Sequence, residues 1–129
     1  MSVQMHHVFV YGTLRSGCRN LTIHLPSCES IEAVAAPEFT LRTLGRFPMV
    51  HRGGDTAIRG EVLALGDDEL AAVDRLEGHP DWYQREVIEV QLAGGGTAQA
   101  WIYLMPPESH QDAAVIASGD WVEYLRGLE

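Results

Sequence analysis

The chain has 129 residues, enough for one domain with a single hydrophobic core, and 46% of them are hydrophobic. Its 18 Asp and Glu residues oppose 9 Arg, and the absence of Lys brings the formal net charge to −9. The negative charge disfavours nucleic acid as a partner. The absence of Lys excludes lysine Schiff-base chemistry and phosphate loops of the GxxxxGK type.

Membrane segments and metal sites are not predicted either. No apolar run approaches the ~20 residues of a membrane-spanning helix, and the N-terminus lacks a signal-peptide pattern, so we expect a cytoplasmic protein without a membrane partner. Cys18 and Cys28 are then expected to be reduced thiols. The 6 histidines show neither an HExxH motif nor zinc-finger spacing, which argues against a structural zinc site.

The first predicted strand covers residues 7–14 and ends in a turn at Gly12. In the motif YGTLRSG, glycine allows positive φ and close backbone approach. The consecutive N–H groups of Gly12, Thr13 and Leu14 could therefore converge on an anion. An ordinary turn at the end of a strand is the alternative interpretation.

The next part of the chain gives weaker signals. Residues 18–30 are expected to form a loop with one helical turn at most. Residues 31–44 alternate well enough for a strand pair or one bent strand, with Phe39 and Leu41 on one face. Residues 45–55 are rich in turn formers and predict a long loop, either a cover over a site or a plain connection.

The second half contains clearer elements. A strand is predicted at 57–64, where Gly60 would let another backbone or a ligand come close. Residues 83–92 and 98–105 form an antiparallel pair joined by the turn AGGGT, and 118–129 holds a short amphipathic helix. We therefore expect a single α+β domain over 1–129, a small mixed β-barrel of about five to six strands flanked by one central and one C-terminal helix.

The central helix is predicted between Gly66 and Gly78. Asp67 or Asp68 can accept hydrogen bonds from the N–H groups of the first turn, while Gly78 tolerates a left-handed cap. Pro80 prevents the helix from continuing.

One carboxylate of this helix is predicted to face the core. At about 100° per residue, Leu70, Val73 and Leu76 span one arc, with Glu77 near its centre and Asp74 at its edge. A buried carboxylate loses hydration, so Glu77 is either a hydrogen-bonded structural group or a functional acid. The position of Asp74 fits hydrogen bonding better than catalysis.

Other reactive side chains lack the partners that catalysis requires. Cys18, Ser16 and Asp120 have no histidine in a defined relation to them, so none is predicted to be a nucleophile. Arg15 is either a surface charge or a clamp on a substrate carboxylate. The large aromatics mainly supply buried area, as core or as pocket wall, and they are Trp82, Trp101 and Trp121.

Three fragments in this order resemble the γ-glutamylcyclotransferase-like (AIG2-like) family, including its small bacterial members. They are the strand running into YGTLRSG, the helix ending DRLEG, and HPDWYQR. FTLRTLGRFPMV, RGEVLAL and SGDWVEYL extend the resemblance over nearly the whole chain. It implies a small mixed β-barrel with flanking helices and conversion of a γ-glutamyl compound into 5-oxoproline and a free amine.

The resemblance also implies a set of site residues. In the family, the YGTL turn cradles the glutamyl end of the substrate, and the glutamate at the helix end is the acid/base. A tyrosine adds a hydroxyl to the pocket. The matching positions are Glu77 as catalytic residue and Tyr11, Gly12, Thr13, Leu14, Tyr83 and Arg85 for substrate binding. Neither a metal nor an organic cofactor is implied, and the partner is a small γ-glutamyl substrate bound by a monomer or a homodimer.

The implied chemistry needs few protein groups. The α-amine of a γ-glutamyl amide attacks its own δ-carbonyl, and well-oriented intramolecular reactions reach effective molarities of about 10⁵ to 10⁸ M. Glu77 would accept a proton from the α-amine and deliver one to the leaving amine, and burial would raise its pKa above the ~4.3 of a free Glu. Backbone N–H groups of the turn would hold the substrate carboxylate or the oxyanion.

Two other functions use the same pocket. A non-catalytic module would bind a γ-glutamyl or other small acidic ligand without forming product. An amine transferase would replace the intramolecular attack by an external amine, and would need room for a second substrate beside Glu77. The leaving group could be an amino acid, a peptide such as glutathione, a polyamine or a lysine side chain.

Overall fold

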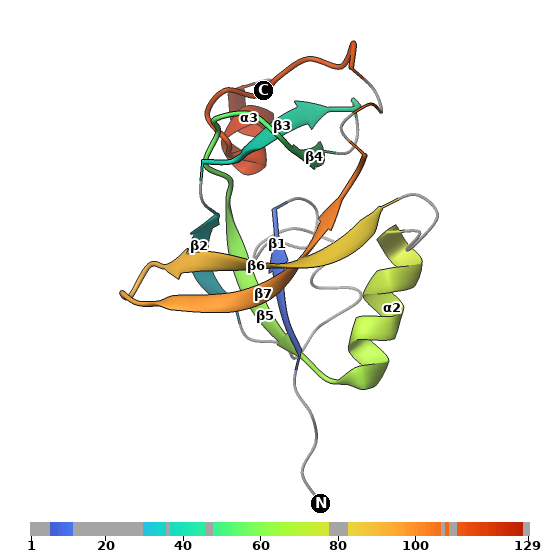
Figure 1. The fold of residues 1–129 in the computed structure, drawn as a ribbon, viewed down its shortest axis with the longest axis vertical. Helices are drawn as coiled ribbons and strands as arrows, with labels where there is room; N and C mark the ends of the chain where they lie inside the picture. The colour runs from blue at the N-terminus through green and yellow to red at the C-terminus, as the bar shows by residue number, and fades with distance from the viewer. Residues whose placement is uncertain are drawn as a thin grey trace, which may run out of the picture.

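The computed structural model describes residues 6–11, 30–35, 37–45, 48–77, 83–106, 108 and 111–127. These residues form a closed mixed β-barrel, a two-stranded sheet and two helices (Figure 1), which confirms the expected fold class. The barrel strands, in the order in which they neighbour one another, are β1 (His6–Val10), β5 (Arg59–Leu65), β2 (Ser30–Ala35), β6 (Gln84–Leu92) and β7 (Thr97–Leu104). The second sheet pairs β3 (Phe39–Thr43) with β4 (Pro48–Arg52), and the helices are α2 (Asp67–Glu77) and α3 (Trp121–Gly127).

Strand β1 closes the barrel. It runs antiparallel to β5 and parallel to β7, where Val8 pairs with Trp101 and Phe9 with Ile102. The other neighbouring strands of the barrel are antiparallel. The strand that leads into the YGTL motif is therefore hydrogen-bonded on both of its edges.

Alternating side chains divide the apolar residues into two cores. Successive residues of a strand point to opposite faces, so each barrel strand sends every second side chain inward. The inner core contains Phe9, Val62 and Ile102, and Trp121 of α3 joins it. Figure 1 shows α3, β3 and β4 gathered at one end of the barrel, while α2 runs along its side.

The second core lies between the barrel and α2. Leu70 and Val73 of the helix are 7% and 1% exposed, as the predicted buried arc requires. Full burial of such side chains contributes about 1.5–3 kcal/mol each. Their partners on the barrel include Val8, Val10, Leu63 and Leu65. The helix bounds also match the prediction, although the side chains of Leu76 and Glu77 lie outside the described part.

The prediction of a long loop over 45–55 is wrong, because β4 forms there. Pro48 is the first residue of the strand, a position where the missing N–H is tolerated. Met49 and Val50 are fully buried, so apolar burial outweighs the turn formers around them. Gly45 and Gly53, with φ of 94° and 92°, make the turns on either side of this strand.

Residues 31–44 form two separate strands that do not pair with each other. β2 lies in the barrel between β5 and β6, whereas β3 pairs with β4 in the other sheet. Phe39 and Leu41 are buried on one face of β3, as expected. The loop predicted at 18–30 lies outside the described residues except for Ser30, which begins β2.

The hairpin and the terminal helix are confirmed. β6 and β7 pair antiparallel around the AGGGT turn, in which Gly95 and Gly96 take positive φ. The segment just before α3 is joined to β5 by a hydrogen bond from Arg59 N to Gly119 O at 2.8 Å. Within the part of the chain that the structure describes, no helix is long and apolar enough to cross a bilayer.

Gly60 lies where two backbones approach closely. A Cβ on this residue would meet the carbonyl oxygen of Val10 and would lie 2.8 Å from Cζ of Phe9. The expected close approach at Gly60 is thus made by the neighbouring strand β1, in the part that leads to the YGTL motif.

We predict that Gly60→Ala destabilises the protein by about 1–3 kcal/mol, as overpacking in a filled interior does. The added methyl must push β1 away, because its nearest neighbour is a backbone atom. Urea unfolding measures the change. Gly94→Ala is the matched control, since a Cβ there meets nothing within 4 Å. Equal unfolding midpoints for the two variants would contradict the close approach.

Candidate functional site

The described part of the predicted site comprises residues at the end of β1, in the last turn of α2 and on the hairpin of β6 and β7, which are linked by hydrogen bonds. Tyr11 follows β1 directly and is 6% exposed. Its hydroxyl donates to the carbonyl oxygen of Tyr103 at 2.6 Å. The first residue of the YGTL motif is thereby fixed to β7, and the tyrosine ring packs in the inner core.

Tyr83 immediately precedes β6 and is 3% exposed. Its hydroxyl donates to the carbonyl oxygen of Pro48 at 2.6 Å. A phenol has one proton to donate, so in this arrangement Tyr83 can meet a further group only as an acceptor. The bond also joins the start of β6 to the start of β4.

Asp74 receives hydrogen bonds from Arg85 and Tyr103. Arg85 donates from Nε to Oδ1 at 2.8 Å and from Nη2 to Oδ2 at 3.2 Å, and the Tyr103 hydroxyl donates to Oδ1 at 2.6 Å. The Asp74 and Arg85 side chains are 19% and 20% exposed. The expectation that Asp74 is a hydrogen-bonding carboxylate is confirmed, and its bonds join the last turn of α2 to β6 and β7.

Arg85 is held on two sides. Its Cζ lies 4.3 Å from the centre of the Trp101 ring, within the range of cation–π contacts. The hydrogen bond to Asp74 raises the pKa of the Arg85 guanidinium, while burial acts in the opposite direction. Arg85 therefore stays charged as the counter-ion of Asp74, and its predicted contact with substrate stays a prediction.

Glu77 is the last residue of α2, three residues after Asp74. Three residues are nearly one helical turn, so the anchoring of Asp74 acts in the last turn of the helix, which ends at Glu77. The Glu77 side chain, together with Gly12, Thr13 and Leu14, lies outside the described part of the structure. Their assignment to the site stays a prediction.

The remaining candidates are structural or lie outside the described residues. Asp120 accepts a hydrogen bond from the N–H of Glu123 at 3.1 Å and so caps the short helix α3. Trp121 belongs to the inner core, and Trp101 is partly buried against the second core. The described residues contain no group of three or more His, Cys, Asp or Glu that could hold a metal ion. Outside the description are Arg15, Ser16, Cys18, Cys28 and Trp82.

Tyr103 is the site residue that the sequence analysis missed. It pairs with Arg85 across the β6–β7 hairpin, and both side chains lie on the outer face of the barrel. The alternation of β7 and the register of the AGGGT turn could have placed Tyr103 beside Arg85. The local sequence pattern does not show that α2 packs against Arg85 and Tyr103.

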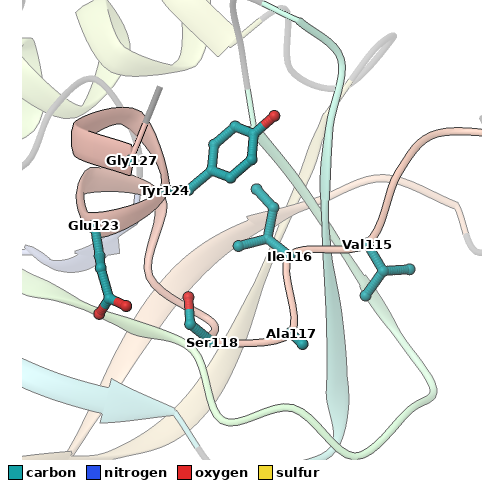
Figure 2. Close-up of a pocket in the computed structure, with 7 residues that line it drawn as sticks. All are labelled: Val115, Ile116, Ala117, Ser118, Glu123, Tyr124 and Gly127. Carbon is teal, nitrogen blue, oxygen red and sulfur yellow. The ribbon is translucent and has the colours of Figure 1, made fainter. Parts of the chain in front are cut away.

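A pocket of about 350 Å³ lies apart from these residues, between α3 and the segment that leads into it (Figure 2). Its lining residues share no member with the predicted site, and they are Val115, Ile116, Ala117, Ser118, Glu123, Tyr124 and Gly127. It gives no support to a site at the end of α2.

The ion pair between Asp74 and Arg85 gives a test of how α2 is held. We predict that Asp74→Asn costs about 1.5–3 kcal/mol of stability, because a partly buried ion pair loses its negative charge and one of its charge-assisted hydrogen bonds. Glu86→Gln is the control, since the Glu86–Arg52 pair is 47% and 45% exposed and such pairs contribute about 0–1 kcal/mol. Urea unfolding at one ionic strength compares them, and equal losses would contradict the anchoring role.

Comparison with known proteins gives consistent results. The sequence model of a family described as gamma-glutamyl cyclotransferase, AIG2-like, matches residues 8–123. A Vibrio cholerae protein, provisionally named gamma-glutamylcyclotransferase, is 39% identical over 118 residues, which are 92% of this chain and 96% of that protein. The gamma-glutamylaminecyclotransferase of Bos taurus is 32% identical over 117 residues, 78% of this chain and 68% of that protein.

A solved structure agrees with the fold. The crystal structure of an AIG2-like protein from Mus musculus superposes with a TM-score of 0.79, covering 92% of this chain and 88% of the mouse chain. Sequence identity in that comparison is 22%, so the likeness is one of fold.

Proposed function

This chain belongs to the AIG2-like gamma-glutamyl cyclotransferase family, and we propose that it cyclises a γ-glutamyl amine or amino acid to 5-oxoproline, with Glu77 as general acid and base. The observation that supports this best is the anchoring of the α2 end beside the start of the YGTL motif. Tyr103 contacts both Tyr11 and Asp74, and Asp74 lies nearly one turn before Glu77.

The proposed reaction is balanced without a co-reactant. The α-nitrogen of the glutamyl group forms a bond to its own δ-carbonyl carbon, and the bond from that carbon to the leaving nitrogen breaks. The α-ammonium loses two protons, and the departing amine gains two. Glu77 transfers them in turn, accepting from the α-nitrogen and donating to the leaving nitrogen. No water is consumed, and no covalent enzyme intermediate forms.

The other predicted residues have binding roles in this proposal. The N–H groups of Gly12, Thr13 and Leu14 bind the substrate carboxylate or the developing oxyanion. Tyr83, whose proton is donated to Pro48, accepts a hydrogen bond from a substrate N–H group. Arg85 holds Asp74 through Nε and Nη2, and its proposed contact with substrate is made from that anchored position.

We predict that Glu77→Gln lowers kcat for 5-oxoproline release by about 10²–10⁴-fold, the usual contribution of a general acid or base. The amide keeps the shape of the side chain and cannot take up the proton. The assay follows 5-oxoproline from γ-glutamyl amines and γ-glutamyl amino acids, with circular dichroism as a check of the fold.

Glu89→Gln is the matched control, because it changes an exposed glutamate on the outside of β6 in the same way. Turnover that survives in Glu77→Gln would exclude Glu77 as the acid/base. If neither the unmodified protein nor either variant forms product while a γ-glutamyl compound raises the melting temperature, the protein is a binding module.

The charge of the chain favours one class of leaving group within this proposal. With a net charge of −9, the protein repels substrates that carry additional carboxylates. We predict a higher kcat/KM for a γ-glutamyl amine than for γ-glutamyl-glutamate, with a difference that shrinks as salt is added. A kcat/KM ratio that stays constant between low salt and about 0.5 M salt would contradict an electrostatic origin.

A further inference from the structure

Tyr103 contacts both halves of the proposed site with different atoms. Its carbonyl oxygen accepts the hydrogen bond of the Tyr11 hydroxyl at 2.6 Å, and its own hydroxyl donates to Asp74 Oδ1 at 2.6 Å. Tyr11 begins the YGTL motif, and Asp74 lies in the last turns of α2. One residue of β7 therefore links the two segments that carry the proposed binding and catalytic groups.

The strand that carries Tyr103 is a firm support. β7 is paired on both edges, with β6 over its whole length and with β1 through Trp101 and Ile102. Tyr103 itself is 3% exposed. A buried side chain on a central strand moves little. Both hydrogen bonds therefore attach Tyr11 and Asp74 to a rigid part of the barrel wall.

Hydrogen bonds fix α2 in a way that its apolar face does not. The contacts of Leu70 and Val73 turn the apolar face of the helix toward the barrel, but they are non-directional and fix the last turn less sharply than hydrogen bonds do. The carboxylate of Asp74 is held from two directions, by Tyr103 and by Arg85, which is itself stacked on Trp101. The orientation of the last turn is set there.

We propose that Tyr103 is a positioning residue, which sets the distance between the YGTL turn and Glu77 through its bonds to Tyr11 and Asp74. The inference rests on the proposed function of Glu77. Tyr103 acts on the reaction through Asp74 and the end of the helix, and does not touch the substrate. A displacement of about 1 Å between reacting groups can lower the rate about 10²-fold. A hydroxyl that only positions the end of α2 can therefore change kcat.

The test uses Tyr103→Phe, which removes the hydroxyl and keeps the ring and the carbonyl oxygen. We expect kcat to fall by about 10- to 100-fold while KM changes less than about twofold, because substrate binding is retained and only the transition-state geometry is lost. Tyr124→Phe is the matched control, a phenol removed on α3. Ile58→Val, which removes one buried methylene of the inner core, controls for a loss of stability alone.

A double-mutant cycle with Asp74→Ala separates positioning from contact with the substrate. If Tyr103 acts through Asp74, the double variant is no slower than Asp74→Ala, since the shared interaction is already lost. Multiplied effects on kcat, or a raised KM with unchanged kcat in Tyr103→Phe, would overturn the positioning role. Wild-type kcat in Tyr103→Phe would overturn it as well.

Amide hydrogen exchange keeps the inference separate from the proposed function. Tyr103→Phe should speed exchange at the amides of residues 74–77 by about tenfold relative to Tyr124→Phe, because the last turn of α2 loses an anchor. If the unmodified protein turns over no γ-glutamyl compound, the proposed reaction fails, and the anchoring is still decided by this measurement. Unchanged exchange at 74–77 would overturn it.

Discussion

The hydrogen bonds to the carboxylate of Asp74 decide how the helix and the barrel fit together. A carboxylate that is 19% exposed has lost much of its hydration, so it must find donors within the protein. Tyr103 and Arg85 supply them from neighbouring strands of one hairpin. Because hydrogen bonds are directional, these donors restrict how the last turn of α2 can sit on the barrel, and with it the position of Glu77 in the chain.

The barrel makes such precision possible. Five strands closed into a ring leave β1 and β7 hydrogen-bonded on both edges, and the inner core fills the space between them. The backbone of Tyr103 on β7 holds Tyr11 at the beginning of the YGTL motif, and its hydroxyl holds Asp74 in the last turn of α2. The segments proposed to bind and convert substrate follow the ends of β1 and α2 in the sequence, and such connecting segments commonly carry function.

Local patterns predicted the elements that local energetics determine. The 3.6-residue periodicity and the capping residues gave α2 its bounds, and the AGGGT turn identified the hairpin. β4 was missed because Pro48, Gly45 and Gly53 suggested a loop, whereas burial of Met49 and Val50 in the assembled fold favours a strand. Likewise, the assignment of β2 and β3 to different sheets depends on pairing with strands far along the chain. The role of Tyr103 is also non-local, since Asp74 reaches it from 29 residues away.

The filled interior has an evolutionary consequence. Phe9, Ile102 and Trp121 fill the inner core, so the barrel serves as a support, and the proposed acid/base Glu77 belongs to a helix packed on its outer wall. Mutations inside the ring then act on folding, whereas under the proposed function mutations around the α2 end act on substrate choice. The two kinds of change can accumulate separately, so descendants of one stable ring can acquire different substrates without first rebuilding their core.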